Sequence, residues 1–416
     1  MSWLKQLRDN FARPFLLIAG LLLAAISSRA DAPVCSSVFH ENPQSLEAGY
    51  MYMGDSIRPH LVAILERSQE SIDMEMSLAP NKELFDLFRR KREQGVKIRV
   101  VLDNRSANKS EKHRATWDAV LAELRSLGVE YAISDKEALI KARGFPGAVF
   151  HRKLILVDNK YFYIGSSNFT VYDMNQEMGY FGPTKNSADF KKVFESDFHA
   201  ALDSWQNEAY KARKNPEIQF KDDSVKLVGP GTQYPDLRSL LLQQIGAAQR
   251  QILISAYEAT DTGILKTLID KKRQFPEIDI RVVLCVGKLP VRLWGKNFEI
   301  PKNARFLDAL MKAGIDVRVY GNETQYNHSR FGLFDDVVYG SSADFVQRSF
   351  QGSVDLGFIA KDHDLANLSR RNFDALWDVS RYKEEVTIRD RLIDGFFLMA
   401  ERINYFFLQI KLLAAG

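Results

Sequence analysis

The sequence of 416 residues contains only two cysteines, Cys35 and Cys285, and no Cys-x-x-Cys pair. Two thiols cannot build the disulfide framework that stabilises small secreted domains, and the cysteine spacing of zinc sites is absent. In an oxidising compartment the two could pair, or they could be unrelated thiols; the count leaves both open. The chain also lacks the Gly-x-Gly-x-x-Gly and P-loop motifs. The sequence therefore indicates neither a disulfide scaffold nor a nucleotide-binding loop.

The excess of basic residues is concentrated at the N-terminus. Three of them precede the apolar run FLLIAGLLLAAI, and the small residues of SSRA follow it. This order predicts a signal peptide over residues 1–30, cleaved after Ala30, and therefore a secreted or periplasmic protein; the alternative is an uncleaved membrane anchor. Without residues 1–30 the chain has 53 basic and 52 acidic side chains. The remaining charge does not favour a nucleic-acid partner.

The rest of the chain contains one pattern of helices and strands twice. The first copy predicts alternating helices and strands over 56–68, 71–78, 82–95, 97–104, 114–127 and 129–134. The second predicts the same order over 237–249, 251–257, 264–274, 278–286, 304–314 and 315–320. The pentapeptide Ile-Arg-Val-Val-Leu stands at 98–102 and again at 280–284. A repeat of this length indicates a duplicated α/β domain, with mixed sheets flanked by helices.

The domain boundaries follow from this repeat. We expect a first lobe over 40–214, a polar linker over 215–232 and a second lobe over 233–384. Residues 385–416 have no counterpart in the first lobe and predict a C-terminal amphipathic helix. Residues 288–303, inserted in the second lobe, are expected to form a solvated loop near the cleft.

One short motif occurs in both copies at corresponding places. In the first, His151, Lys153 and Asp158 are followed by Gly165, Ser166 and Asn168. In the second, the matching residues are His328, Arg330 and Asp335, followed by Gly340 and Ser341. Side chains two apart on a strand point the same way, so each histidine is expected to lie beside a cation. An imidazole beside a fixed cation suits chemistry at a phosphate.

This pattern resembles the phospholipase D superfamily, whose signature is His-x-Lys-x4-Asp followed by Gly-Ser-x-Asn. The resemblance covers both lobes and implies a single active site at their interface. The first motif matches fully. The second departs from it, with Arg330 in place of lysine and Asp344 in place of asparagine. Arginine keeps the positive charge but has a planar fork. Asp344 would bring a negative charge near the phosphate unless it is paired.

The resemblance also implies supporting residues. A carboxylate shortly after the Gly-Ser motif is expected to hydrogen-bond the histidine and fix its tautomer. Glu177 and Asp355 occupy these positions, so Glu177 is expected to orient His151, and Asp355 to orient His328. The family further implies that Ser166 and Ser341 contact phosphate oxygens. The two motif aspartates, which have the opposite strand parity to the histidines, are expected to be structural.

The resemblance implies a phosphodiesterase that cleaves phospholipid headgroups through a phosphohistidine, with transphosphatidylation if an alcohol replaces water. His151 is the expected nucleophile and His328 the expected acid, and the scheme needs no cofactor or metal. The other five histidines show no metal-ligand spacing. The alternatives are a cardiolipin synthase-like phosphatidyltransferase, a nuclease of the same family, and a non-catalytic lipid- or partner-binding protein. We expect a monomer that acts on phospholipid or at a membrane surface, with nucleic acid the less favoured partner.

Overall fold

The computed structural model describes residues 50–54, 57–77, 80–105, 110–145, 147–168, 177–183, 187–205, 225–228, 236–285, 288–293, 296–301, 303–321 and 326–382. All of them lie within one compact unit, Ser37–Gly416. The predicted signal peptide, Cys35 and the predicted C-terminal helix lie outside the described residues. Within these ranges, no helix combines the length and the apolar character that a membrane span requires.

The first lobe is built on a mixed sheet of seven strands. Their order is β1 (Tyr50–Gly54), β7 (Glu177–Pro183), β6 (Tyr161–Gly165), β5 (Leu154–Val157), β2 (Ser71–Met76), β3 (Lys97–Asp103) and β4 (Glu130–Ser134). The strands β2, β3 and β4 are parallel, and the other pairs are antiparallel. A parallel pair needs a crossover connection, which explains why helices separate these three strands.

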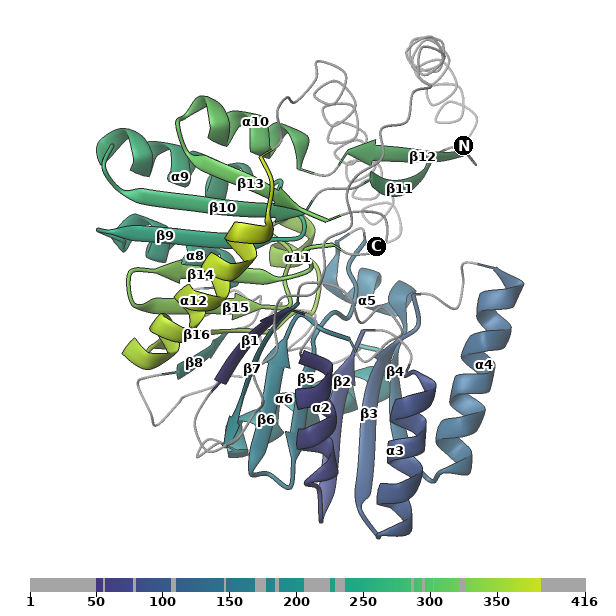
Figure 1. The fold of residues 1–416 in the computed structure, drawn as a ribbon. Helices are drawn as coiled ribbons and strands as arrows, with labels where there is room; N and C mark the ends of the chain where they lie inside the picture. The colour runs from purple at the N-terminus through teal and green to yellow at the C-terminus, as the bar shows by residue number, and fades with distance from the viewer. Residues whose placement is uncertain are drawn as a thin grey trace, which may run out of the picture. The chain divides into compact units, whose positions relative to one another are not determined.

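Helices cover both faces of this sheet (Figure 1). On one face lie α2 (Ile57–Glu66), α3 (Lys82–Glu93) and α4 (Glu111–Ser126), and on the other lies α6 (Ser187–Leu202). Along β3, Ile98, Val100 and Leu102 pack with the first group, whereas Val101 belongs to the core that contains α6. The strand is apolar on both sides, as expected for a parallel strand covered by helices on both faces. A short helix, α5 (Lys136–Arg143), follows β4.

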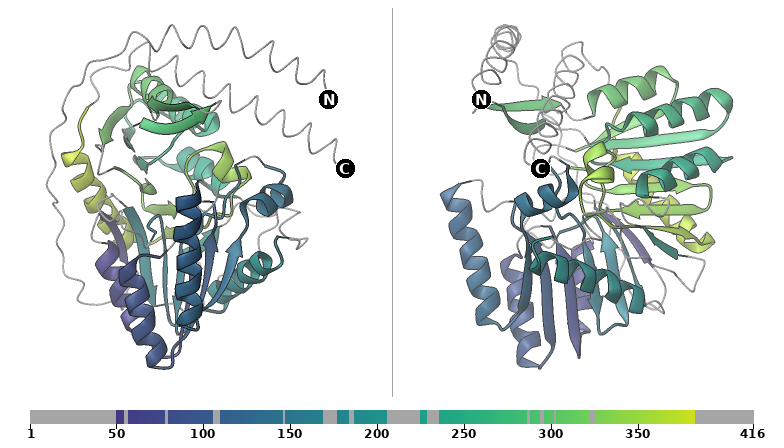
Figure 2. Two further views of the ribbon diagram at one scale, coloured as in Figure 1. Left: turned by 90° about the vertical axis from the view of Figure 1, so that its right-hand side faces the viewer. Right: turned by 180° about the vertical axis from the view of Figure 1, so that it is seen from behind.

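The second lobe repeats this architecture. Its seven strands have the order β13 (Asp316–Tyr320), β10 (Asp279–Cys285), β9 (Gln251–Ala256), β14 (Arg330–Phe334), β15 (Val337–Ser341), β16 (Gly357–Lys361) and β8 (Val225–Val228). The helices α8 (Leu237–Ala247), α9 (Thr262–Gln274) and α10 (Ala304–Lys312) pack on one face, and α12 (His363–Val379) on the other (Figure 2). A one-turn helix, α11 (Gln347–Gln351), precedes β16.

The two copies of the pentapeptide occupy the same place. They form the centres of β3 and β10, and each pairs in parallel with the strand before it. Leu102 lies opposite Met76 in the first sheet, and Leu284 lies opposite Ala256 in the second. The predicted duplicated α/β fold is therefore confirmed.

Three predictions of local structure need correction. The strand β8 falls inside the predicted linker and pairs with β16 at the edge of the second sheet. The predicted loop over 288–303 contains a hairpin, β11 (Lys288–Leu293) and β12 (Lys296–Pro301). The helix α5 was not predicted. All three are short elements, so the periodicity of their apolar residues gives little signal.

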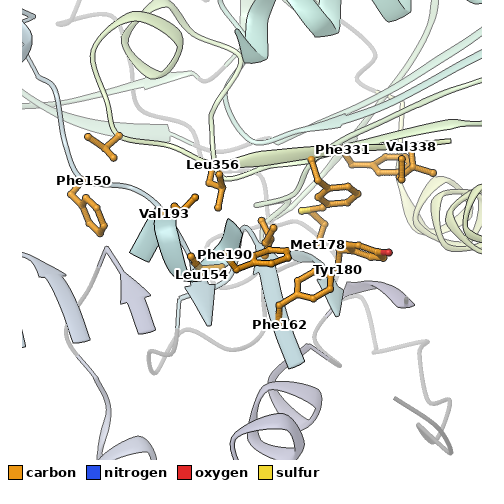
Figure 3. Packing of buried hydrophobic residues seen from close by; sticks show 14 of the residues in the cluster. Phe150, Leu154, Phe162, Met178, Tyr180, Phe190, Val193, Phe331, Val338 and Leu356 are labelled. Carbon is orange, nitrogen blue, oxygen red and sulfur yellow. The ribbon is translucent and has the colours of Figure 1, made fainter. Parts of the chain in front are cut away.

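The two lobes share one hydrophobic core. Figure 3 shows Phe150, Met178 and Tyr180 of the first lobe in the same cluster as Phe331 and other residues of the second. The Tyr180 ring also stacks on a second-lobe phenylalanine, Phe358, with 4.8 Å between centroids. This packing brings together the two segments that carry the motifs.

Candidate active site

A backbone bridge between the lobes positions His151. The His151 N–H donates to the Val354 carbonyl at 2.8 Å, and the Val354 N–H donates to the Val149 carbonyl at 2.9 Å. Residues 151–153 precede β5, so the predicted strand begins three residues later than expected. The bridge places Asp355, the residue after Val354, next to the imidazole. His151 Nδ1 lies 3.0 Å from Asp355 Oδ1.

His328 has a matching contact in the opposite direction. Its Nδ1 lies 2.7 Å from Oε1 and 2.9 Å from Oε2 of Glu177, which begins β7 of the first lobe. The expectation that each carboxylate orients the histidine of its own lobe was wrong. Each one instead reaches the histidine of the facing lobe, because the strands that follow the Gly-Ser segments line the shared core. Each histidine therefore depends on both lobes for its orientation.

These contacts define the tautomers. A carboxylate accepts a hydrogen bond from Nδ1–H, which leaves the lone pair of the neutral ring on Nε2. Burial lowers the pKa of His151 well below its usual value, and the charges of Lys153, Arg105 and Arg330 lower it further. Burial and Arg330 also lower the pKa of His328, although Glu177 partly opposes this. Both rings are therefore neutral near pH 7, and Nε2 can act as a nucleophile or base.

Lys153 lies next to His151, as expected. Its side chain is fully buried, and Nζ donates to the His151 carbonyl oxygen at 2.6 Å. Burial lowers the pKa of Lys153 well below its usual value, and Arg330 and Arg105 add to this effect, while Asp355 opposes it. A bound phosphate would restore the charge of this amine, because an anion favours the protonated form.

In the second motif the cation forms an ion pair with a carboxylate of the same motif. Nε and Nη2 of Arg330 both lie 2.8 Å from Asp344 Oδ1, and its Nη1 donates to the His328 carbonyl at 2.6 Å. The Arg330 Nη2 also lies 3.1 Å from His328 Nε2. Burial opposes ionisation of Asp344, but the charge of Arg330 holds its pKa below the usual value. The unusual aspartate is therefore paired with the unusual arginine.

This pairing predicts that Arg330→Lys is harmful alone and tolerated together with Asp344→Asn. A lysine amine cannot make the forked contacts of the guanidinium, and it would leave the buried Asp344 imperfectly paired. We expect the single variant to lose about 10- to 100-fold in kcat/KM, since a hydrogen bond to a charged group contributes about 1.5–3 kcal/mol. The double variant, which has the lysine and asparagine of the first lobe, should recover most of this loss. Equal losses in the two variants would show that the pair is not coupled.

The motif aspartates Asp158 and Asp335 occupy structural positions. The Asp158 carboxylate accepts three backbone N–H bonds from residues 69–71, at 2.8–2.9 Å. The Asp335 carboxylate does the same with residues 249–251. Both residues have positive φ, of 53° and 52°, in the hairpin turns that end β5 and β14. These contacts agree with the expectation that the two aspartates are structural and do not carry the chemistry.

The serine of the first motif supports its carboxylate. Ser166 Oγ donates to Glu177 Oε2 at 2.5 Å and accepts from the Met178 N–H at 2.8 Å. Asn168 accepts hydrogen bonds from the N–H and hydroxyl of Ser77, at 3.2 and 2.8 Å. The first lobe therefore uses these polar groups to fix the Gly-Ser segment.

The corresponding serine of the second lobe is Ser342. Its Oγ donates to Asp355 Oδ1 at 2.7 Å and accepts from the Leu356 N–H at 3.0 Å, repeating the contacts of Ser166. The sheet register explains this. Ser341 pairs with Gly357 in the second sheet, and Gly165 pairs with Gly179 in the first. Ser341, and not Gly340 as predicted, is therefore the structural counterpart of Gly165. Ser341 instead donates to the Ala343 carbonyl at 3.2 Å. The hairpin turn before it is one residue shorter than in the first lobe, which shifts the alignment.

Three further residues near the site were missed. Ser342 could have been found from the Ser-Ser pair that both motifs contain. Arg152 donates from Nε to the Asp355 carbonyl at 3.0 Å and forms an ion pair with the buried Asp197. Arg105 lies just after β3, at the end of a parallel strand where binding residues often gather. The sequence pattern gave no reason to choose either arginine.

The comparisons with known proteins agree with this duplicated site. The family model described as "Cardiolipin synthase, PLD-like domain" matches residues 61–201 and 241–377. None of the curated protein sequences matches this chain. Phosphatidylserine synthase from Haemophilus influenzae Rd KW20 has a similar structure, with a TM-score of 0.65 and 10% identity, covering 86% of this chain and 94% of that one. At this identity the likeness establishes the fold alone.

Two weaker structural matches are polyphosphate kinase from Porphyromonas gingivalis and Nuc, a phospholipase D family member from Salmonella typhimurium. The first has a TM-score of 0.49 at 13% identity, covering 85% of this chain and 56% of that one. The second has a TM-score of 0.32 at 20% identity, covering 39% of this chain and 99% of that one. Both scores are too low to support an inference. The family model alone matches more than half of the sequence, once in each lobe, and the chain therefore belongs to the phospholipase D superfamily.

Proposed function

We propose that this protein is an exported phospholipase D-type phosphodiesterase that cleaves phospholipid headgroups through a phosphohistidine intermediate. The observation that carries the proposal is that each of the two histidines contacts a carboxylate from the other lobe. Each has Nδ1 against a carboxylate of the facing lobe, at 3.0 Å for His151 and 2.7 Å for His328. Two imidazoles held in this way can serve the two ends of one displacement at phosphorus.

In the first step His151 Nε2 attacks phosphorus, the bond to the headgroup oxygen breaks, and a P–N bond forms. The proton needed by the departing alcohol comes from His328. Although burial and Arg330 lower the pKa of His328, the negative charge of a bound phosphodiester favours the protonated ring. Lys153 and Arg330 stabilise charge on the phosphoryl oxygens.

In the second step His328 removes a proton from water, whose oxygen attacks phosphorus and releases His151. An alcohol in place of water gives transphosphatidylation, so a phosphatidyltransferase is the second candidate. The description of the matching family model, which names cardiolipin synthase, supports this candidate. The two reactions share every step up to the choice of acceptor.

Product analysis decides between these functions. The protein is incubated with mixed phospholipids in neutral detergent micelles, with and without glycerol or ethanol, and separately with DNA. Phosphatidic acid and the headgroup alcohol indicate hydrolysis. A new phosphatidyl ester that replaces phosphatidic acid when an alcohol is present indicates transfer. Cleavage of DNA with intact lipids would support a nuclease instead, and the absence of every product would support a binding protein.

The proposed scheme predicts that chelators leave activity unchanged. Both histidines act through ring nitrogens, and the cations that stabilise the phosphoryl group are side chains. We expect the rate of headgroup release in excess EDTA to stay within about two-fold of the untreated rate, where a metal-activated site would lose most of its activity. Calcium can alter lipid packing, so a water-soluble phosphodiester is the matched control substrate. Loss of activity on both substrates, restored by one particular metal, would overturn the histidine scheme.

A further inference from the structure

The pairing of Arg330 leaves the proposed phosphoryl site with little net positive charge. Asp344 neutralises Arg330 through two contacts of 2.8 Å, and both side chains are buried. Of the two motif cations, only Lys153 lacks a carboxylate contact of this kind among the described residues. A phosphodiester gains negative charge on its oxygens as the nucleophile attacks, and catalysis requires groups that stabilise it. The variant second motif therefore calls for another cation.

Arg105 is suitably placed in the first lobe. Its backbone N–H donates to Asp103 Oδ1 at 2.7 Å, while Asp103 Oδ2 accepts from the Phe150 N–H at 2.8 Å, next to His151. Its Nη2 donates to Ser77 Oγ at 3.3 Å, and that hydroxyl donates in turn to Asn168 of the motif. Two short chains of hydrogen bonds thus join Arg105 to the segments that carry His151 and Asn168.

The Arg105 guanidinium is available to a ligand. Its side chain is 24% exposed, and its Nε lies 3.8 Å from Asp103 Oδ1, beyond hydrogen-bond distance. Arg105 lowers the pKa of both His151 and Lys153, so its charge acts directly on the proposed reaction centre. Burial lowers the pKa of Arg105 below its usual value, and the charge of Arg348 lowers it further, while Asp103, Asp344 and Asp355 oppose this effect. Each of these three carboxylates is already engaged by other groups.

The residue that corresponds to Ser77, the hydroxyl partner of Arg105, is different in the second lobe. The sheet registers place Tyr257 where the first lobe has Ser77, since each follows the residue paired with the last leucine of the pentapeptide. The Tyr257 ring packs edge-on against His328, with 4.7 Å between centroids, and lies 5.2 Å from the Arg330 guanidinium carbon. The two lobes therefore differ at the end of this strand: the first has the Ser77 hydroxyl that contacts Arg105, and the second has an aromatic ring beside His328.

We propose that Arg105 is a phosphate-binding residue that contacts the non-bridging oxygens and replaces the charge that Asp344 cancels on Arg330. The proposal rests on the proposed phosphodiesterase function for its catalytic consequence, but not for anion binding itself. It predicts that phosphate affinity and transition-state stabilisation both depend on a positive charge at position 105.

The test measures phosphate binding by calorimetric titration, together with headgroup release and melting temperature. We expect Arg105→Gln to weaken inorganic phosphate binding about 10- to 100-fold, the effect of one hydrogen bond to a charged group. It should lower kcat/KM about 10²- to 10³-fold, while the melting temperature stays within a few degrees. Arg105→Lys should lose less in both measurements, and guanidinium chloride should partly restore Arg105→Ala. The exposed Arg114 of α4 provides the matched control, since Arg114→Gln removes the same charge from the surface.

Adding Asp344→Asn to Arg105→Gln tests whether the loss of phosphate affinity comes from the loss of positive charge. Asp344→Asn keeps a hydrogen-bond acceptor for Arg330 but stops neutralising it, and it introduces the residue type that the first lobe has at the equivalent position, Asn168. Phosphate affinity lost in Arg105→Gln should therefore be partly regained in the double variant. Unchanged affinity in Arg105→Gln would overturn the proposal. So would a loss accompanied by a large drop in melting temperature that guanidinium does not restore in Arg105→Ala, because that pattern indicates a structural role.

The two measurements separate this inference from the function on which it rests. If the wild type cleaves no lipid but binds phosphate in an Arg105-dependent way, the proposed function fails and the binding site stands. If lipid cleavage is normal in Arg105→Gln, the function stands and the inference fails. A wild-type protein without measurable phosphate binding would overturn the inference as well.

Discussion

Replacing His151 with alanine should abolish both headgroup release and the covalent phosphoryl-enzyme. In the proposed scheme His151 Nε2 forms the bond to phosphorus, and alanine offers no atom that can replace it. The first lobe supplies the complete motif, with the buried Lys153 against the His151 carbonyl at 2.6 Å. The measurement is rapid-quench labelling with a phospholipid carrying radioactive phosphorus, together with steady-state product release.

His328→Ala should behave differently. If His328 is the acid, its loss should slow turnover by about 10²- to 10⁴-fold, the usual contribution of a positioned acid. The loss should be much smaller for an aryl phosphodiester, whose leaving group departs without a proton. A label that persists in His151→Ala and vanishes in His328→Ala would reverse the two roles. A label that the wild type itself never forms would reject the covalent route.

The duplicated fold was predictable from the sequence because the same order of helices and strands occurs in both halves of the chain. Strands of the parallel core, such as the two copies of Ile-Arg-Val-Val-Leu, are buried on both faces. The helices next to them in the sequence have a clear apolar period. The pairing of histidine and cation was equally visible, since it depends only on local spacing. The edge strand β8 and the β11–β12 hairpin were not, because strands of four to six residues are too short to show a clear apolar period.

The contact of each carboxylate with the histidine of the other lobe could not be predicted from the sequence of either lobe. Glu177 and Asp355 stand at matching positions in the repeat, so spacing alone assigns each to its own histidine. Which histidine each one reaches depends on how the two sheets pack, and that depends on the shared core rather than on any motif. The one-residue offset that makes Ser342 the counterpart of Ser166 has a similar origin, in a shorter hairpin turn. Local sequence therefore identified the histidines, the motif cations and the carboxylates of the site, but not the contacts between lobes.

The crossed contacts predict that Asp355→Asn impairs the nucleophile in the first lobe, although Asp355 belongs to the second. An asparagine can turn its amide nitrogen toward His151 Nδ1 and stabilise the wrong tautomer, which places the proton on Nε2. We expect headgroup release to fall about 10³- to 10⁴-fold, comparable to the loss of the orienting carboxylate in a catalytic triad. Phosphoryl-enzyme formation should be slow even with an aryl phosphodiester, because attack itself is impaired.

Glu177→Gln should instead impair His328, the proposed general acid. Glu177 partly offsets the effects of burial and Arg330, so its removal lowers the pKa of His328 further. An acid is lost as the pH rises through its pKa, and the alkaline limb of kcat/KM should therefore move to lower pH. This limb should stay in place in Asp355→Asn. Aryl phosphodiesters should label Glu177→Gln at a rate close to that of the wild type. Slow labelling in Glu177→Gln and normal labelling in Asp355→Asn would mean that each carboxylate serves its own lobe, contrary to the crossed geometry.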